Sequence, residues 1–241
     1  PVSILSFINI LYSSYFDYFL SIDAYLITLL ISLIFGSSLY YYGKGANKKI
    51  NFIDELKLII LIYFLVGILI SFPYYLSNFE INFTSAYFEA ISGLTGTGFS
   101  IFKNIKYLDP TLILWRSSSQ WIGGLYFLIF LIIVFSNNQY NFRLNHLVYT
   151  GNMGSFSKAN IKNVLLQIFL VYSLLTLLIF IILNIGSVRL FNSLNLSMTI
   201  ISNGGFLPTN NLGQIFLKDN YYLLAIILLI PTLNIFLIFN F

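Results

Sequence analysis

Long apolar runs separated by short polar connections dominate this chain. Each run is nearly free of charge and about 20 residues long, and a helix of that length crosses the hydrocarbon core of a bilayer, which is about 30 Å thick. The pattern predicts an all-α integral membrane protein with six transmembrane helices. These spans cover residues 2–20, 24–42, 58–76, 111–135, 164–183 and 221–241.

Two further segments, residues 84–100 and 190–207, are too short and too polar to cross a bilayer. The first contains FEAISGLTGTGFS at residues 88–100. Its glycines disfavour a continuous helix, and non-helical backbone at membrane depth is tolerated only where it lines a watery path or is buried in protein. Such a loop can present backbone carbonyls and threonine hydroxyls to a cation. We therefore predict a re-entrant pore loop, with a short helix leading in and an extended selectivity filter leading out.

The second short segment repeats the first. When the chain is aligned with itself so that Leu58 falls on Leu165, the span 58–76 falls on 165–183, and Thr97-Gly98-Phe99 falls on Gly204-Gly205-Phe206. We call this offset the repeat shift. The predicted unit is a helix, a pore loop and a second helix, and it occurs twice, as in membrane proteins whose repeats enclose a path.

The repeat divides the chain into four parts. They are an extra N-terminal helix pair (1–43), a first helix–P-loop–helix repeat (44–136), a cytoplasmic connector (137–163) and a second repeat (164–241).

The charged residues exclude most other classes of protein and suggest an orientation. At 58% hydrophobic and 8% charged residues, the composition lies far outside that of soluble domains, and the small net charge of +4 does not suggest nucleic-acid binding. The connections 43–57 and 137–163 hold seven Lys and Arg residues, against four in the opposite loops. The positive-inside rule therefore places these connections and the N-terminus in the cytoplasm, and both glycine segments on the outer side.

The sequence contains no constellation typical of an enzyme. Paired carboxylates, a Ser/His/Asp set, a nucleotide-binding glycine loop and a Cys/His cluster are all missing, and the chain has no cysteine. His146 stands alone in the polar connector, which disfavours a metal site there. We expect no cofactor in this chain, and only a transported cation.

Gly98 and Gly205 are the strongest candidates for a site. Without a Cβ atom, their backbone carbonyls can approach an ion closely, although a plain turn between a helix and a loop would also use glycine. The hydroxyls of Thr95 and Thr97 could coordinate an ion or could cap the local backbone. The cation-binding residues predicted for the two filters are Thr95, Gly96, Thr97, Gly98, Ser202, Asn203, Gly204 and Gly205.

Glu89 lies in the short helix of the first pore loop, where a buried acid is costly unless it is paired. Arg116, one helix later and near the same depth, is the expected partner. We interpret the two as a structural ion pair that holds the pore helix, in preference to direct ion binding by Glu89. Breaking one partner of such a pair should be strongly unfavourable.

Several short motifs in the sequence resemble those of the Trk/Ktr/HKT superfamily of potassium transporters, specifically of its Trk-type membrane subunit. They are FEAISG (88–93) leading into TGTG (95–98), LWRS (114–117), QWIGG (120–124) and SNGGF (202–206). The resemblance covers most of the chain from Gly43 onward, and the first two spans resemble the extra helix pair of the Trk subgroup. Glycine at position 98 points to potassium, because the resemblance associates serine there with sodium preference.

The resemblance implies four repeats around one pore, of which this chain has two. It also departs from the family at Gly96, where many relatives carry threonine, and it lacks the family's third repeat and the basic residue of its last helix. We expect either the N-terminal half of a longer chain or two assembled copies, a homodimer. The resemblance further implies a cytoplasmic nucleotide-binding regulatory subunit and a place in the cell inner membrane.

Three other functions stand as alternatives. A tetrameric two-span potassium channel is disfavoured because the two loops differ and no Thr-x-Gly-Tyr-Gly is present. A non-conducting half-transporter, acting as a scaffold or inactive partner, is the alternative from a different class. A membrane-embedded enzyme is disfavoured by the lack of paired catalytic groups.

Overall fold

The computed structural model describes residues 1–16, 22–45, 51–135, 158–216 and 221–232, and all regular structure within these ranges is helical. The α-helices are α1 (Val2–Tyr15), α2 (Ile22–Gly43), α3 (Phe52–Tyr75), α4 (Phe83–Leu94), α5 (Pro110–Phe135), α6 (Lys158–Ile185), α7 (Leu190–Ile201) and α8 (Tyr221–Leu229). The 3₁₀ turns are η2 (Ile105–Tyr107), η4 (Leu212–Gln214) and η6 (Ile230–Thr232). An all-α fold is therefore confirmed for the described part of the chain.

Three described helices are long and apolar enough to cross a membrane. They are Ile22–Gly43, Ile53–Tyr75 and Asn163–Ile185, with mean hydropathies of 1.8, 2.4 and 2.7. Helix α5 is 26 residues long, but Arg116, three serines and Gln120 make its first half polar. Those side chains are buried against other helices, so α5 is polar where it faces protein.

The first and last predicted spans differ from the structure or extend beyond it. Helix α1 ends at Tyr15, before the predicted end at Leu20, and its 14 residues reach only about 21 Å at 1.5 Å each. Residues 17–20 and 233–241 of the predicted spans lie outside the described residues. The count of six spans therefore stays a prediction. Helix α6 begins at Lys158, inside the predicted connector 137–163.

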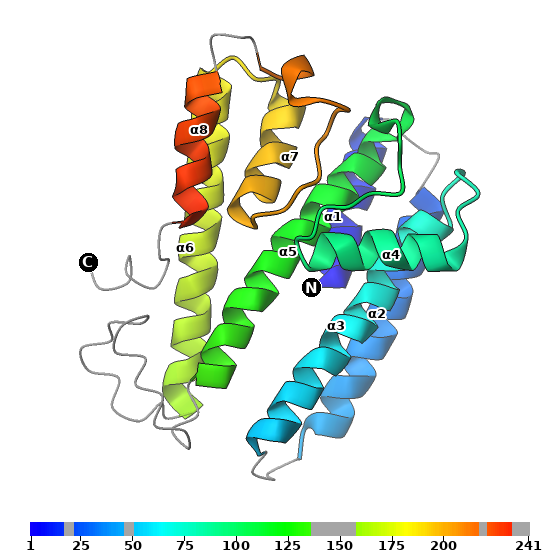
Figure 1. Cartoon of the computed structure of the whole chain (residues 1–241). Helices are drawn as coiled ribbons and strands as arrows, with labels where there is room; N and C mark the ends of the chain where they lie inside the picture. The colour runs from blue at the N-terminus through cyan, green and yellow to red at the C-terminus, as the bar shows by residue number, and fades with distance from the viewer. Residues whose placement is uncertain (17–21, 46–50, 136–157, 217–220, 233–241) are drawn as a thin grey trace.

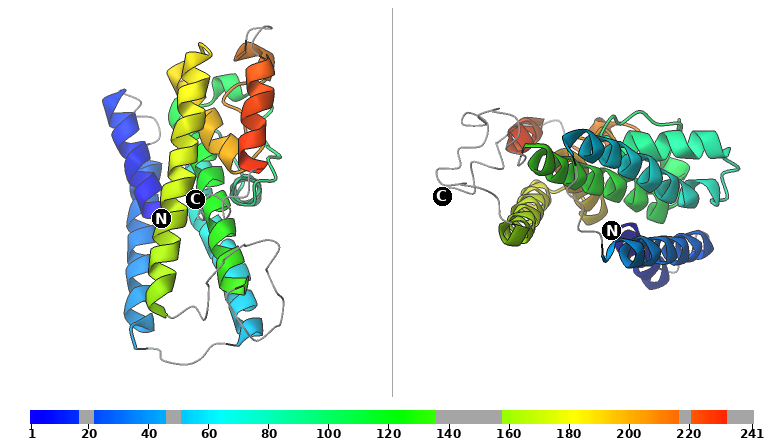
Figure 2. Two further views of the ribbon diagram at one scale, coloured as in Figure 1. Left: turned by 90° about the vertical axis from the view of Figure 1, so that its left-hand side faces the viewer. Right: turned by 90° about the horizontal axis from the view of Figure 1, so that it is seen from below.

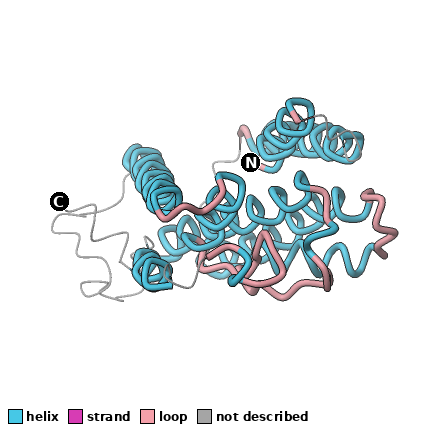
Figure 3. Tube along the Cα trace, turned by 90° about the horizontal axis from the view of Figure 1, so that it is seen from above, coloured by secondary structure: helices cyan, strands magenta, loops and turns pink. Residues whose placement is uncertain are grey.

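The long helices run lengthwise through the molecule, while the short helix α4 lies across its middle and α7 lies in its upper half in Figure 1. Helices α1 and α2 form a pair beside the rest of the bundle (Figure 2). The loops that follow α4 and α7 lie close together on the side away from that pair (Figures 2 and 3). Two segments from different halves of the sequence thus meet at one place.

The two halves of the chain follow the same local backbone path. Helices α4 and α7 are both 12 residues long, and the repeat shift places the start of one on the start of the other, as it does for η2 and η4. The shift also relates two pairs of residues with positive φ, Glu80 (49°) with Ser187 (62°) and Gly96 (69°) with Asn203 (52°). Few residues other than glycine adopt this conformation, so the matching positions show that the repeat extends to individual turns.

Two apolar clusters hold these elements. The first joins the five helices α1, α2, α3, α4 and α5 around the fully buried rings of Tyr25, Tyr74 and Trp115. The second joins α6, α7 and α8 around residues such as Tyr172 and Ile179. Trp121 on α5 packs against both clusters. Helix α5 therefore packs with both halves of the fold.

Candidate ion-binding site

The loop after α4 leaves its helix through glycine and returns along it. Gly96 and Gly98 have φ angles of 69° and 78°, in the left-handed region that favours glycine. The return segment is tied to α4 at two points: Gly98 N donates to Ser92 O (3.3 Å), and Ser92 Oγ donates to Phe99 O (2.6 Å). These bonds fix where the backbone of residues 96–99 runs.

The hydroxyls of Thr95 and Thr97 form a local chain. Thr95 Oγ1 donates to Ile91 O over 2.8 Å and lies 2.7 Å from Thr97 Oγ1. A hydroxyl has one proton, so Thr95 uses its proton on Ile91 and must accept from Thr97. Thr95 therefore caps α4, as in the local alternative considered from the sequence, and the lone pairs of Thr97 stay available.

The loop after α7 has the same design with different side chains. Ser202 Oγ lies 2.9 Å from Met198 O, which matches the bond from Thr95 to Ile91 one repeat earlier. Asn203 takes the positive φ that Gly96 has in the first loop, and asparagine is among the residues that tolerate it. Gly204 N donates to Thr199 O over 2.8 Å.

The structure brings the two loops into direct contact at the predicted glycines. A Cβ atom on Gly98 would lie 2.5 Å from Gly205 Cα and 2.7 Å from Gly205 N, and one on Gly205 would lie 3.1 Å from Gly98 Cα. A Cβ on Gly96 would lie 3.4 Å from Ser202 O. All eight residues predicted for the filters thus belong to two adjoining loops, and a Cβ atom at Gly98 would clash with the backbone of the opposite loop.

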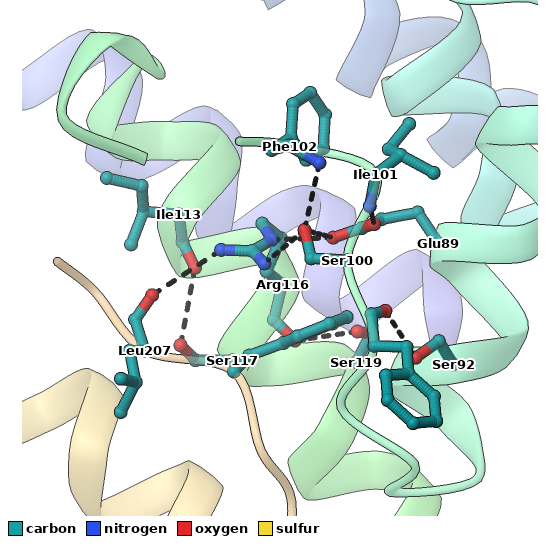
Figure 4. A network of polar contacts seen from close by, with 12 residues as sticks. Glu89, Ser92, Ser100, Ile101, Phe102, Ile113, Arg116, Ser117, Ser119 and Leu207 are labelled. Carbon is teal, nitrogen blue, oxygen red and sulfur yellow. Dashed lines mark hydrogen bonds and ion pairs between the residues drawn. The ribbon is translucent and has the colours of Figure 1, made fainter. Parts of the chain in front are cut away.

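Glu89 and Arg116 contact each other beside these loops. Arg116 Nε lies 2.8 Å from Glu89 Oε1, and the two side chains are 1% and 0% exposed (Figure 4). Glu89 also accepts from Ser100 Oγ (3.0 Å) and from Ile101 N (2.8 Å). The carboxylate therefore joins α4, α5 and the return segment of the first loop.

The guanidinium of Arg116 also reaches the second loop. Its Nη2 donates to Ser100 Oγ (2.9 Å), while Nη1 donates to Leu207 O over 3.4 Å (Figure 4). Its Cζ lies 4.2 Å from the ring centroid of Phe206 and 5.7 Å from that of Phe102, within the range of cation–π attraction. One side chain of α5 thus contacts both loops.

This charged pair belongs to one repeat alone. The repeat shift places Leu196 at the position of Glu89 and Leu223 at that of Arg116. Leu196 is buried on α7, and Leu223 packs against the second apolar cluster. The same helix–loop–helix unit therefore forms with leucine at both positions.

Sequence reasoning missed several contacts that hold the loops. Ser92 and Ser100 bond the first return segment, and Gln120 contacts the second loop. A Cβ on Gly123 would overlap Leu94 O, and one on Gly124 would lie 3.1 Å from Ser202 Cα. The small residues of QWIGG were the available sequence signal for this close packing.

The described part of the chain has no group of three or more His, Cys, Asp or Glu residues that could hold a metal ion.

Comparisons with known proteins show the family to which this chain belongs. A family model described as TrkH, cation transport protein, matches residues 21–236. This chain belongs to the TrkH family. Membership makes it a multi-pass membrane protein of a cation transport family, which is not a family of enzymes.

Individual relatives cover parts of the chain. An uncharacterized cation transporter of Methanocaldococcus jannaschii is 27% identical over 190 residues, which are 77% of this chain and 38% of the relative. The Trk system potassium uptake protein TrkH of Halomonas elongata is 29% identical over 43% of this chain and 22% of its own length. The crystal structure of the potassium transporter TrkH from Vibrio parahaemolyticus superposes with a TM-score of 0.70 at 20% identity.

That superposition covers 95% of this chain and 46% of the Vibrio chain. The chain therefore spans less than half the length of these relatives, and the likeness to the solved structure shows the fold.

Proposed function

We propose that the two adjoining loops form half of a potassium-selective pore through which K⁺ enters the cell. The observation that carries this proposal is the approach of Gly98 to Gly205, where two loops of the same design place their glycine backbones in contact. At glycine positions no side chain blocks access to the backbone carbonyls, so these carbonyls can replace the hydration shell of a cation. The potassium uptake proteins among the relatives support K⁺ as the ion.

The short helices supply the electrostatics. Helices α4 and α7 end at Leu94 and Ile201, directly before the two loops. The carboxyl end of a helix carries a partial negative charge, so both helices favour a cation near the loops. In this mechanism α4 and α7 are re-entrant pore helices, residues 95–98 and 202–205 are the filters, and the ion moves down its electrochemical gradient.

The rest of the pore needs a second half. We propose that two further repeats complete the ring, either in the same polypeptide or in a second copy of the chain. In this arrangement the loops face the outside of the cell membrane, the N-terminus is cytoplasmic, and a cytoplasmic nucleotide-binding subunit regulates the pore. The pair Glu89–Arg116 holds α4 in place and does not bind the ion, because its atoms already bond each other and the loop backbone.

The test is the uptake of ⁸⁶Rb⁺ and ²²Na⁺ by cells that lack their own potassium uptake systems and that express the polypeptide encoded by the gene. Gly98→Ser should lower the preference for Rb⁺ over Na⁺ at least about tenfold, because its Cβ would meet Gly205 backbone atoms and the residue would be strained at positive φ. The matched control is Gly36→Ser on α2, where a Cβ has no neighbour within 4 Å.

Equal selectivity of Gly98→Ser and wild-type protein would refute the assignment of the filter. A loss of assembly without any change in ion flux would favour the non-conducting scaffold instead.

A further inference from the structure

The side chain of Gln120 on α5 is fully buried and faces the second loop. In one orientation of its amide, both the nitrogen and the oxygen have hydrogen-bond partners. In this orientation Nε2 donates to Thr199 Oγ1 over 3.1 Å, while Oε1 accepts from Gly205 N (3.1 Å) and from Phe206 N (3.2 Å). A single side-chain oxygen therefore binds two successive backbone amides of the loop.

These two bonds determine the direction of two carbonyls. A trans peptide is planar, with its C=O pointing opposite to the N–H of the next residue, and the described residues contain no cis peptide. Because the amides of Gly205 and Phe206 point towards Gln120, the carbonyls of Gly204 and Gly205 must point away from α5. In an ordinary extended strand successive carbonyls alternate in direction. Two on one side depart from that pattern, and the bonds to Gln120 hold them there.

The second loop is enclosed on both sides and cannot move away from Gln120. A Cβ atom on Gly204 would overlap the Gln120 amide, and the other side of Gly205 lies against the backbone of Gly98. One helical turn earlier on α5, and thus on the same face of the helix, Arg116 donates to Leu207 O. Helix α5 of the first repeat therefore holds the loop of the second repeat over residues 204–207.

No similar amide follows in the second repeat. The repeat shift places Ile227, a fully buried apolar residue, at the position of Gln120. The contact therefore runs from the first repeat to the second, and α8 offers no equivalent side chain at this position.

We propose that Gln120 is a positioning residue for ion selection, which fixes the carbonyls of Gly204 and Gly205 towards the ion path. This inference rests on the proposed pore function. Gln120 itself does not touch the ion, since its oxygen is occupied by two amides and its nitrogen by Thr199.

The test compares Gln120→Met, Gln120→Glu and Gln167→Met in the polypeptide that the gene encodes. Methionine keeps the unbranched shape without hydrogen bonds, and a neutral glutamic acid keeps both an acceptor and a donor. Gln167 is an exposed glutamine of α6 and provides the matched control. The readouts are the preference for ⁸⁶Rb⁺ over ²²Na⁺ in cells and the rise in melting temperature of the purified protein in KCl relative to NaCl.

We expect Gln120→Met to lower the preference about tenfold, as loss of one to two hydrogen bonds would allow, and to abolish the additional stabilisation by KCl. Gln120→Glu should restore much of both, and Gln167→Met should behave as wild type. A general packing role would lower the melting temperature equally in both salts and leave selectivity intact, which would overturn the proposal. A wild-type protein that does not distinguish the two cations would overturn the pore function, and this inference with it.

Discussion

The buried pair of Glu89 and Arg116 can be tested by a double-mutant cycle. The double variant of this cycle carries leucine at both positions, as the second repeat already does. Both side chains are at most 1% exposed, and the second repeat carries leucine at the two equivalent positions. Replacing either one alone with leucine leaves the other charge buried, and we expect this to lower the free energy of unfolding by about 3 to 5 kcal/mol.

Replacing both residues removes both charges together. The remaining cost comes from Ser100 Oγ and Ile101 N, which lose Glu89 as acceptor, and from Leu207 O, which loses Arg116 as donor, at about 1 kcal/mol each. The double variant should therefore lose about 3 kcal/mol, against about 6 to 10 kcal/mol if the two single effects added independently. A buried charge without its partner costs more than the loss of the pair, and the difference measures the coupling.

The assay is unfolding in mixed micelles with increasing dodecyl sulfate, followed by tryptophan fluorescence. The chain has two tryptophans, and Trp115 is fully buried next to Arg116 in the sequence. The control is Lys57→Leu in the pair Lys57–Asp54, whose atoms are 3.6 Å apart and whose side chains are 73% and 57% exposed. Such a surface pair contributes little, so its loss should be barely measurable.

Additivity within about 0.5 kcal/mol in the cycle would show that the two charges do not depend on each other, and the reasoning would be wrong. Single variants that fail to accumulate in the membrane, beside a double variant that does accumulate, would support the same coupling.

Two further substitutions test the packing and conformation of the loops. Gly123→Ala should lower the free energy of unfolding by about 1 to 3 kcal/mol, because its Cβ would overlap Leu94 O. The control Gly36→Ala should stabilise the protein or be neutral, since no atom lies within 4 Å of its Cβ. Equal effects of the two substitutions in the same micelle titration would contradict the packing argument. Asn203→Gly should leave ⁸⁶Rb⁺ uptake close to wild type, because φ is 52° at Asn203 and the equivalent residue Gly96 already adopts such an angle; a large fall in uptake would instead show that the Asn203 side chain contributes to ion binding.

The elements that could be predicted are those encoded by local pattern. Hydrophobic length identified the regions of α2, α3 and α6, and the helices α4 and α7 begin within one residue of their predicted segments. Helix α1 ends at Tyr15, short of the predicted Leu20, and residues 17–20 of that span lie outside the described residues. Apolar composition alone does not determine where a helix ends, because capping and neighbouring helices decide it.

For the candidate site, the sequence by itself determined the glycine positions and the repeat, since the Gly-Phe motif of the first loop occurs at the equivalent position of the second loop. Only the tertiary structure decided which partners these loops have. Arg116 reaches Leu207 O and Gln120 reaches Phe206 N across 91 and 86 residues of sequence. Such contacts depend on how α5 is rotated against both loops, and that rotation follows from the packing of whole helices, which no local pattern of residues encodes.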